Sequence, residues 1–320
     1  MLRPDLVLGV LSLYPLLHTL ISLLLALAGM VSQGAGATIG MSGPTAGPGD
    51  VVQTTSQHLP ANLTPTIAKA AADQPASYSD GCHLQPGQSK AKVCTYGDKH
   101  ASKQVVLFGD SHAASWLPAL DALGKSQHWR ILNITKSACP IPQVTVAVRG
   151  KVAPDCDKWR TNALKAIKGI HPNLVVATSI DHVYTIPGKP GAAFQPAWQA
   201  GMTTTLEALR ARADKVILLG DSPLWKQLAP DCLRAHRSDI GACATKRSDA
   251  VFADKIASAH QAAIDANVAF ADTTPITCVA DPCPVVVGKY LLLRDDSHMT
   301  ATWSRHLAPA LKTLLAPVAP

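Results

Sequence analysis

The chain has 320 residues, of which 47% are hydrophobic and 16% are charged, and this balance excludes a largely disordered protein. Its length suits one sizeable domain with appendages. The formal net charge of +7 comes from basic residues that form no run of five or more Lys or Arg, so nucleic acid is not an expected partner.

The first predicted element is an apolar segment from Leu6 to Val31 that contains no Asp, Glu, Lys or Arg. About 20 apolar residues span a bilayer, so residues 1–31 are predicted to be a transmembrane anchor with the following domain on the extracytoplasmic side. A cleaved signal peptide, followed by secretion, is the alternative, because Ala35-Gly36-Ala37 resembles a small-residue cleavage site. Residues 32–77, rich in Gly, Ala, Thr and Pro and without a hydrophobic period, are predicted to be a flexible linker.

Eight cysteines follow, and none has a Cys-x-x-Cys spacing with a matching pair of histidines, so no metal site or cofactor is predicted. The cysteines fall into four couples that are close in sequence, which predicts local disulfides and an oxidising compartment. The predicted pairs are Cys82 with Cys94, Cys139 with Cys156, Cys232 with Cys243, and Cys278 with Cys283.

From residue 78 to residue 318 short apolar runs alternate with stretches of helical character, which predicts one domain. Five such repeats indicate an α/β fold, in which a five-stranded, mostly parallel sheet lies between two layers of helices. The uninterrupted hydrophobicity of the strands agrees with burial on both faces. The predicted strands are 104–108, 130–135, 173–178, 215–219 and 267–271, and the predicted helices are 113–126, 156–169, 195–212, 246–266 and 300–315.

Two of these strands run into Gly-Asp-Ser, in VVLFGDSHAASW at 105–116 and VILLGDSPLW at 216–225. Ligands of parallel sheets bind beyond such strand ends. Ser111 is followed by apolar residues at helical spacing, which places it at a helix N-terminus that favours a developing oxyanion. Ser222 is followed by Pro223, which removes one backbone N–H from the turn. Ser111 is therefore the predicted nucleophile, and the second turn is predicted to line the same cleft.

A serine nucleophile needs a positioned base. In RDDSHMTATW, Asp295 and His298 are three residues apart just before the last predicted helix. This spacing lets the carboxylate orient the imidazole while the other ring nitrogen faces Ser111. Asp296 is the alternative orienting residue. Asp110 is interpreted as a turn and helix-cap residue rather than as a catalytic acid.

The order of Gly109-Asp110-Ser111-His112 and Asp295-x-x-His298 resembles the SGNH hydrolase superfamily of GDSL-type esterases. More narrowly, His112, the paired cysteines, ITKSACP at 134–140 and LRDDSHMT at 293–300 are similar to the SGNH domain that follows a multi-span acyltransferase-three membrane domain in bacterial envelope proteins. The resemblance implies a flavodoxin-like SGNH hydrolase fold over residues 78–318. It also implies a Ser-His-Asp triad and no cofactor.

The chain departs from this family pattern in two ways. The Gly-x-Asn-Asp block that supplies an oxyanion-hole Asn in many SGNH esterases is absent, and Ala177-Thr178-Ser179-Ile180-Asp181-His182 stands at the end of the third predicted strand. The Ser111 amide, with Ser137, Thr178 and His112 as helpers, is therefore the predicted oxyanion or substrate-binding set. The multi-span domain is also absent, and the apolar segment at 6–31 is interpreted as a relic of its last span or as an independent anchor.

Together these features predict an extracytoplasmic O-acyltransferase. It would move a small acyl group, expected to be acetyl, from an ester donor to a hydroxyl of a cell-envelope glycan through an acyl-serine, with a membrane acyl-exporting domain as a possible partner. A carbohydrate O-acyl esterase is the first alternative, since hydrolysis shares the acylation step. A glycan-binding domain without catalysis is the second, because the oxyanion Asn is missing.

Overall fold

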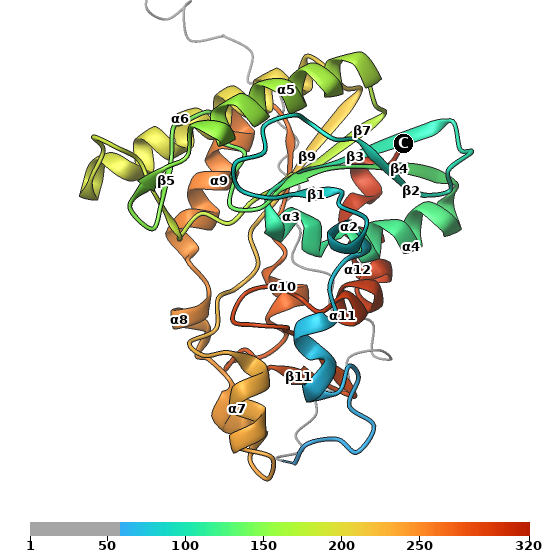
Figure 1. Ribbon diagram of the computed structural model, residues 1–320, viewed down its shortest axis with the longest axis vertical. Coiled ribbons are helices and arrows are strands. Elements are labelled where there is room, and N and C mark those ends of the chain that lie inside the picture. The colour runs from blue at the N-terminus through green and yellow to red at the C-terminus, as the bar shows by residue number, and fades with distance from the viewer. Residues whose placement is uncertain (1–57) are drawn as a thin grey trace, which may run out of the picture. The chain divides into compact units, whose positions relative to one another are not determined.

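The computed structural model describes residues 58–320, which are built around a seven-stranded sheet (Figure 1). Its five central strands are parallel, and each coincides with a predicted apolar run. The α/β fold with a mainly parallel sheet is therefore as predicted. In spatial order these strands are β4 (Trp129–Lys136), β3 (Lys103–Gly109), β7 (Leu174–Thr178), β9 (Lys215–Leu219) and β10 (Ala269–Ala271).

Two short strands that were not predicted extend the sheet beyond β4. β1 (His83–Leu84) pairs parallel to the end of β4, and β2 (Cys94–Gly97) pairs antiparallel to its first half. The Cys82–Cys94 disulfide joins the two strands. All four predicted disulfides are present, and no described cysteine is free.

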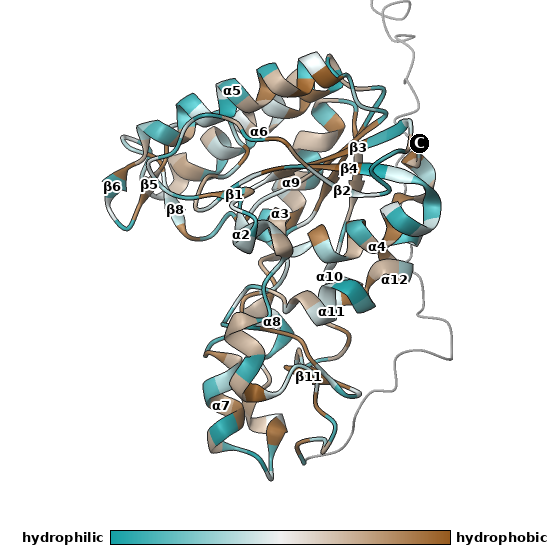
Figure 2. Ribbon diagram, turned by 45° about the vertical axis from the view of Figure 1, so that its right-hand side comes forward, coloured by the Kyte–Doolittle hydropathy of each residue, from teal (hydrophilic) through white to brown (hydrophobic). Residues whose placement is uncertain are grey.

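Alternate residues of each central strand face two separate hydrophobic cores, which is why the strands are apolar throughout. On β3, Val106 and Phe108 face the core beneath α5 (Pro154–Ile170), α6 (Phe194–Arg210) and α9 (Ala253–Asp265). Val105 and Leu107 face the opposite core. In Figure 2 the strands are largely brown, whereas the covering helices alternate teal and brown. The helices of the second layer are α3 (Ser111–Ser115), α4 (Leu117–Gln127), α11 (Ala301–His306) and α12 (Ala308–Leu315).

The predicted helices at 113–126 and 300–315 are each two helices. Pro118 and Pro309 stand in the first turn of α4 and α12, where a residue without an N–H is tolerated but the preceding helix cannot continue. The predicted helix at 246–266 is also divided, into α8 (Arg247–Ala250) and α9.

The connections that follow β9 and β10 form an accessory lobe that was not predicted, with α7, α8 and β11 at the bottom of Figure 1. Their sequences lack a regular hydrophobic period, and two disulfides, Cys232–Cys243 and Cys278–Cys283, lie within them. The indole nitrogen of Trp225 donates to the carbonyl of Cys283 at 3.1 Å and so joins the two connections. Besides α8, the lobe contains α7 (Ala229–Ala235), η3 (Ile240–Cys243), α10 (Thr274–Thr277), β11 (Val286–Val287) and β12 (Tyr290–Leu291).

The last part of the segment predicted as a linker, residues 32–77, is folded. It forms η1 (Ile67–Ala72) and the start of α2 (Ala76–Ser79), and Leu63 is buried in the core that the lobe shares with the sheet. The Asp73 carboxylate accepts a hydrogen bond from the backbone of Thr302 at 3.0 Å. A few well-spaced apolar residues are enough to pack this segment, so the prediction of a flexible linker is wrong from residue 58 onward.

A small three-stranded sheet lies beside α5, formed by β5 (Ala147–Val148), β6 (Lys151–Val152) and β8 (Tyr184–Thr185). The predicted anchor at 1–31 and the rest of the predicted linker lie outside the described residues. Within residues 58–320 no helix combines the length and apolarity needed to cross a bilayer.

Candidate active site

The turn that carries Ser111 joins β3 to α3 and requires glycine at its first position. Gly109 has φ +153°, and a Cβ there would lie 1.9 Å from the carbonyl oxygen of Thr178. Asp110 is fully buried and caps α3 by accepting from the backbone of His112 at 2.9 Å. Its other carboxylate oxygen accepts from the backbone of Ile180 at 3.1 Å and ties the turn to the loop after β7.

Asp110 is therefore a structural residue, as interpreted from the sequence. Burial raises the pKa of its carboxyl to about 7, although the hydrogen bonds that it accepts oppose this shift. Tyr184, on β8, donates its hydroxyl to the same carboxylate at 3.2 Å. These contacts fix the backbone that presents Ser111 at the first position of α3, where Ser111 is partly exposed.

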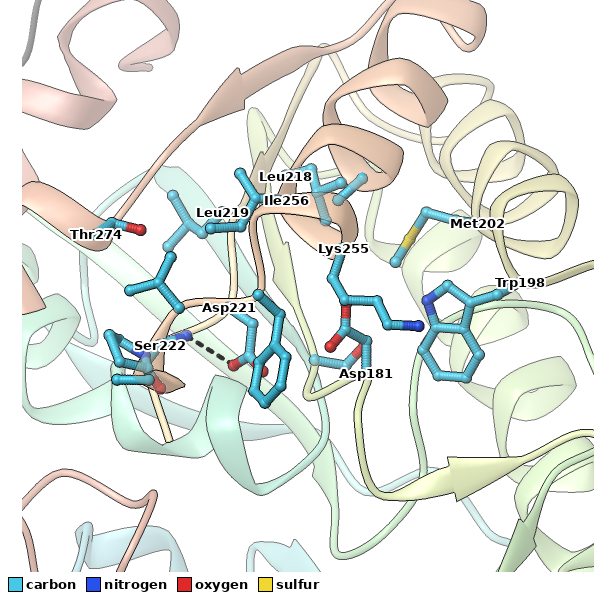
Figure 3. Close-up of a pocket in the computed structure, with 16 residues that line it drawn as sticks. Asp181, Trp198, Met202, Leu218, Leu219, Asp221, Ser222, Lys255, Ile256 and Thr274 are labelled. Carbon is cyan, nitrogen blue, oxygen red and sulfur yellow. Dashed lines mark hydrogen bonds between the residues drawn. The ribbon is translucent and has the colours of Figure 1, made fainter. Parts of the chain in front are cut away.

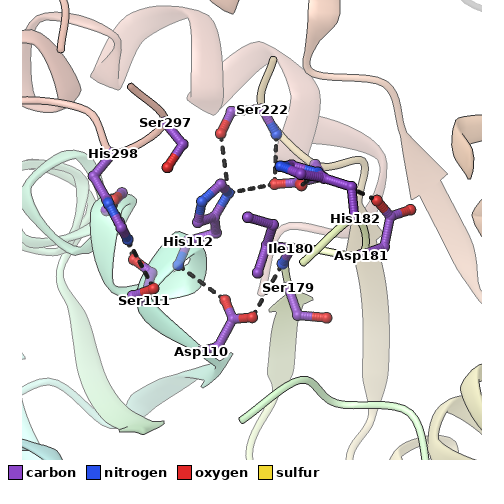
Figure 4. A network of polar contacts seen from close by, with 12 residues as sticks. Asp110, Ser111, His112, Ser179, Ile180, Asp181, His182, Ser222, Ser297 and His298 are labelled. Carbon is purple, nitrogen blue, oxygen red and sulfur yellow. Dashed lines mark hydrogen bonds and ion pairs between the residues drawn. The ribbon is translucent and has the colours of Figure 1, made fainter. Parts of the chain in front are cut away.

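Ser111, His298 and Asp295 form a continuous chain of hydrogen bonds. His298 Nε2 lies 2.8 Å from Ser111 Oγ, and His298 Nδ1 lies 2.7 Å from Asp295 Oδ2, although 187 residues separate the serine from the histidine (Figure 4). Asp295 Oδ1 also accepts from the backbone of Ser297 and His298, at 2.9 and 2.7 Å. Asp296 is not part of this hydrogen-bonded chain. Its backbone carbonyl accepts a hydrogen bond from the backbone N–H of Trp225. The geometry therefore selects Asp295 over Asp296 as the partner of the imidazole.

The charges around His298 and Asp295 make His298 suited to accept a proton near neutral pH. Burial alone would raise the pKa of Asp295, but the hydrogen bond and charge of His298 and two backbone N–H donors hold it well below its ordinary value. Burial lowers the pKa of His298, and the Asp295 carboxylate only partly opposes this effect. The aspartate is thus ionised and the imidazole is neutral at pH 7.

The second Gly-Asp-Ser turn, which ends β9, meets the first one at His112. His112 Nδ1 lies 2.5 Å from Asp221 Oδ1 and 3.3 Å from Ser222 Oγ, so one ring nitrogen contacts both residues. A catalytic histidine must contact the acid with one nitrogen and the nucleophile with the other. Ser222 therefore lacks the arrangement of an activated nucleophile, although its turn borders the same site.

His112 is a buried neighbour of the base and is not an open surface group. Its ring meets that of His298 edge-on, with centroids 5.0 Å apart, and its Nε2 has no hydrogen-bond partner among residues 58–320. Burial lowers the pKa of His112 to about 4 and raises that of Asp221. Both shifts favour the neutral form of each group.

The structure does not bring the other predicted helpers into hydrogen-bond contact with Ser111. Ser137 follows β4, and its backbone N–H donates to Leu84 of β1 at 2.7 Å. Thr178 ends β7 beside Gly109, and its buried hydroxyl has no partner in the described part of the chain. Trp116 and Trp303 are 1% and 2% exposed and are packing residues.

A second cluster that was not predicted flanks the base. Arg294, next to Asp295, donates to the hydroxyl of Tyr78 at 2.9 Å, and the Tyr78 ring stacks on His83 at 4.5 Å. Burial, and then the charges of Arg294 and His298, lower the pKa of His83 to about 3. The only sequence signal for this cluster was the predicted start of the domain at residue 78.

A small, partly open cavity adjoins the second turn (Figure 3). Its polar lining includes Asp181 and Asp221, which follow the ends of β7 and β9. Sequence reasoning did not select these two residues, although each stands directly beyond a buried strand. The apolar lining includes Trp198, Met202, Leu218, Phe252 and Ile256.

A parallel α/β sheet with a serine after its first central strand and an Asp-x-x-His before its last helices defines the class of SGNH-type acyl hydrolases and acyltransferases. Residues 81–313, well over half of the chain, match the family described as the SGNH domain fused to AT3 domains. The chain therefore belongs to this family.

Several solved structures are similar to this chain. The periplasmic domain of a lipopolysaccharide acetyltransferase from Salmonella ser. Paratyphi A is 16% identical, with a TM-score of 0.53 over 69% of this chain and 85% of that one. A mutant of Axe2, an acetyl-xylooligosaccharide esterase from Geobacillus, is 13% identical, with a TM-score of 0.40 over 68% and 96%. A putative acylhydrolase from Bacteroides fragilis is 15% identical, with a TM-score of 0.41 over 70% and 91%. No curated protein matches the chain.

Proposed function

We propose that the protein is an extracytoplasmic serine O-acyltransferase that moves a small acyl group, acetyl in the first instance, onto hydroxyls of a cell-envelope glycan. The hydrogen-bonded chain from Ser111 through His298 to Asp295 is the observation that carries the proposal. Family membership supports acyl chemistry of the SGNH type. The chain needs no cofactor for this reaction.

In the first half-reaction Ser111 Oγ attacks the carbonyl carbon of an ester, and its proton passes to His298 Nε2. The tetrahedral intermediate collapses as the donor's alkoxide leaves with that proton, so that an acyl-serine and an alcohol are formed. In the second half-reaction a sugar hydroxyl gives its proton to His298 and attacks the acyl-serine. Collapse of the second intermediate returns the proton to Ser111 and releases the acylated sugar. Asp295 remains ionised and orients the imidazole throughout.

The oxyanion contacts in this proposal begin with the Ser111 backbone N–H, because Ser111 is the first residue of α3 and its amide has no carbonyl of that helix behind it. The unpartnered hydroxyl of Thr178, which pairs with Gly109 on the strand next to β3, is a supporting candidate. Ser137 and His112 remain further candidates.

The proposed setting is the outer side of a membrane, with residues 1–31 as anchor and a catalytic domain that includes residues 78–318. The family's fusion to AT3 domains supports a membrane-bound acyl donor. The acetyltransferase among the structures with the same fold is a periplasmic domain that acts on lipopolysaccharide, which supports a glycan acceptor. Four disulfides agree with an oxidising compartment.

The test uses the purified full-length chain, an activated acetyl ester and a panel of envelope oligosaccharides. We expect a mass increase of one acetyl group on the peptide that contains Ser111 after rapid quenching, and acetylated sugars formed faster than free acetate. Water as the sole acceptor across the panel would leave an esterase. Absence of acyl-serine with every donor would reject both enzymes and favour a glycan-binding domain.

A further inference from the structure

Behind His112, on the side away from Ser111, lies a cluster of three residues that the acyl-transfer mechanism does not use. Asp181 and His182 follow β7, and Asp221 follows the neighbouring strand β9. One donor atom from each residue lies within 4.8 Å of the other two. Figure 4 shows His182 beside Asp181. Parallel strand ends have thus brought two carboxylates and one imidazole together.

The spacing within the cluster is too long for hydrogen bonds but close to that of ligands on one metal ion. His182 Nδ1 lies 3.6 Å from Asp181 Oδ1 and 3.8 Å from Asp221 Oδ2. Two donors at about 2.0–2.1 Å from a tetrahedral ion stand about 3.3 Å apart. The two distances to His182 are thus close to this value, and the two carboxylates, which lie within 4.8 Å of each other, would have to close around the ion for all three side chains to bind it.

His182 supplies an independent observation. Its side chain is only 8% exposed, yet neither ring nitrogen has a hydrogen-bond partner among residues 58–320. Its ring stacks on Phe252 with centroids 4.8 Å apart, which fixes its plane. A buried imidazole without partners is costly, and coordination through Nδ1 would satisfy the nitrogen that faces both carboxylates.

The lysine of the same cavity does not account for the cluster. Lys255 lines the same cavity, but its ammonium lies 4.6 Å from the centre of the Phe194 ring and donates to Gln195 Oε1. Its charge is therefore engaged by residues of α6.

We propose that Asp181, His182 and Asp221 form a binding site for a divalent transition-metal ion of the Zn²⁺ type. One imidazole and two carboxylates suit such an ion better than Ca²⁺ or Mg²⁺, which favour oxygen ligands alone. Asp181 and Asp221 line the open cavity, so a fourth position is available to water or a ligand from that side.

The site would be coupled to the active centre through a single residue. Asp221 directs Oδ2 to the cluster and Oδ1 to His112, whose ring packs against His298. An ion held by Oδ2 would fix the carboxylate that positions His112. The bound ion would thus stabilise the position of His112 beside the active centre without contacting the reacting atoms.

The test is a calorimetric titration of the chelator-treated, full-length chain with Zn²⁺. We expect one tight site in the unaltered chain and at least about a tenfold loss of affinity in Asp181→Asn and in His182→Gln, because each removes one of three ligands. Co²⁺ bound to the unaltered chain should give the intense visible absorption of a tetrahedral ion, and Zn²⁺ should abolish that absorption.

Asp214→Asn is the matched control. His171 Nδ1 lies 3.6 Å from Asp214 Oδ1, but this pair is at the surface with side chains 64% and 50% exposed. The control removes the same charge from the same spacing and should leave the tight site intact. Equal Zn²⁺ affinity in the unaltered chain and in both cluster variants would overturn the proposal, as would octahedral or absent Co²⁺ absorption.

Discussion

The two Gly-Asp-Ser turns have the same sequence and differ in almost every contact. In the first, Asp110 caps a helix and Ser111 faces His298. In the second, Asp221 and Ser222 both contact one nitrogen of His112, a residue of the first turn. The comparison teaches that the tripeptide specifies a strand end and a polar surface, whereas the partner of the serine determines its chemistry.

The strongest way to break this comparison is to remove each hydroxyl. Ser111→Ala should lower kcat for a small aryl ester by about 10⁴-fold or more, because loss of a nucleophile removes the whole covalent route. Ser222→Ala should keep activity within a few-fold, since no base is positioned for this serine. Steady-state kinetics of the two variants decide the matter, and equal losses would contradict our assignment of Ser111.

The two aspartates can be compared in the same assay. Asp295→Asn should lower kcat by about 10³- to 10⁴-fold, because an amide cannot hold His298 in the correct tautomer. Asp221→Asn should cost no more than about tenfold, since Asp221 reaches the base only through His112. A larger loss for Asp221→Asn than for Asp295→Asn would reverse the roles of the two turns.

Substitution of the glycine in each turn should affect the stability of the protein to different extents. In Gly109→Ala the new Cβ would lie 1.9 Å from a backbone oxygen, so we expect a loss of about 3 kcal/mol or more in the free energy of unfolding. In Gly220→Ala the nearest atom is 3.4 Å away, and the cost should stay near or below about 1 kcal/mol. Urea unfolding measures both values, and similar costs would show that the first turn can adjust.

Sequence reasoning succeeded where a pattern is local. Uninterrupted apolar runs identified the central strands, and the motifs around Ser111 and His298 identified residues that the structure places 2.8 Å apart. The accessory lobe has no such period, because disulfides and scattered apolar residues hold it together. The contacts of Asp181 and His182 with Asp221 depend on β7 and β9 being neighbours, and strand order is not written in any one segment.

The folded segment before residue 78 shows the same limit from the other side. Leu63, Ile67 and Ala70 are buried at spacings of four and three residues, as on one face of a helix, but three residues interrupted by Pro65 form too short a pattern to distinguish a packed segment from a linker. The segment is held in place by the surface on which it packs. Much of that surface comes from residues more than 100 positions later in the chain.

The smallest effect concerns the histidines of the two turns and is a matter of pH. His298 must be neutral to accept a proton, and burial lowers its pKa below the ordinary value of 6.5. The value of kcat/KM should therefore be constant around pH 7 and should fall, by about tenfold per pH unit, only below the lowered pKa.

The variants separate the two turns by the pH at which this fall begins. The Asp295 carboxylate raises the pKa of His298, so in Asp295→Asn the residual activity should begin to fall at a lower pH than the activity of the unaltered chain. A matched profile of Ser222→Ala should coincide with that of the unaltered chain, because the hydroxyl that this change removes contacts His112, whose pKa of about 4 keeps it neutral over this range. An acid limb above pH 6.5, or one that shifts in Ser222→Ala but not in Asp295→Asn, would mean that the titrating base belongs to the second turn.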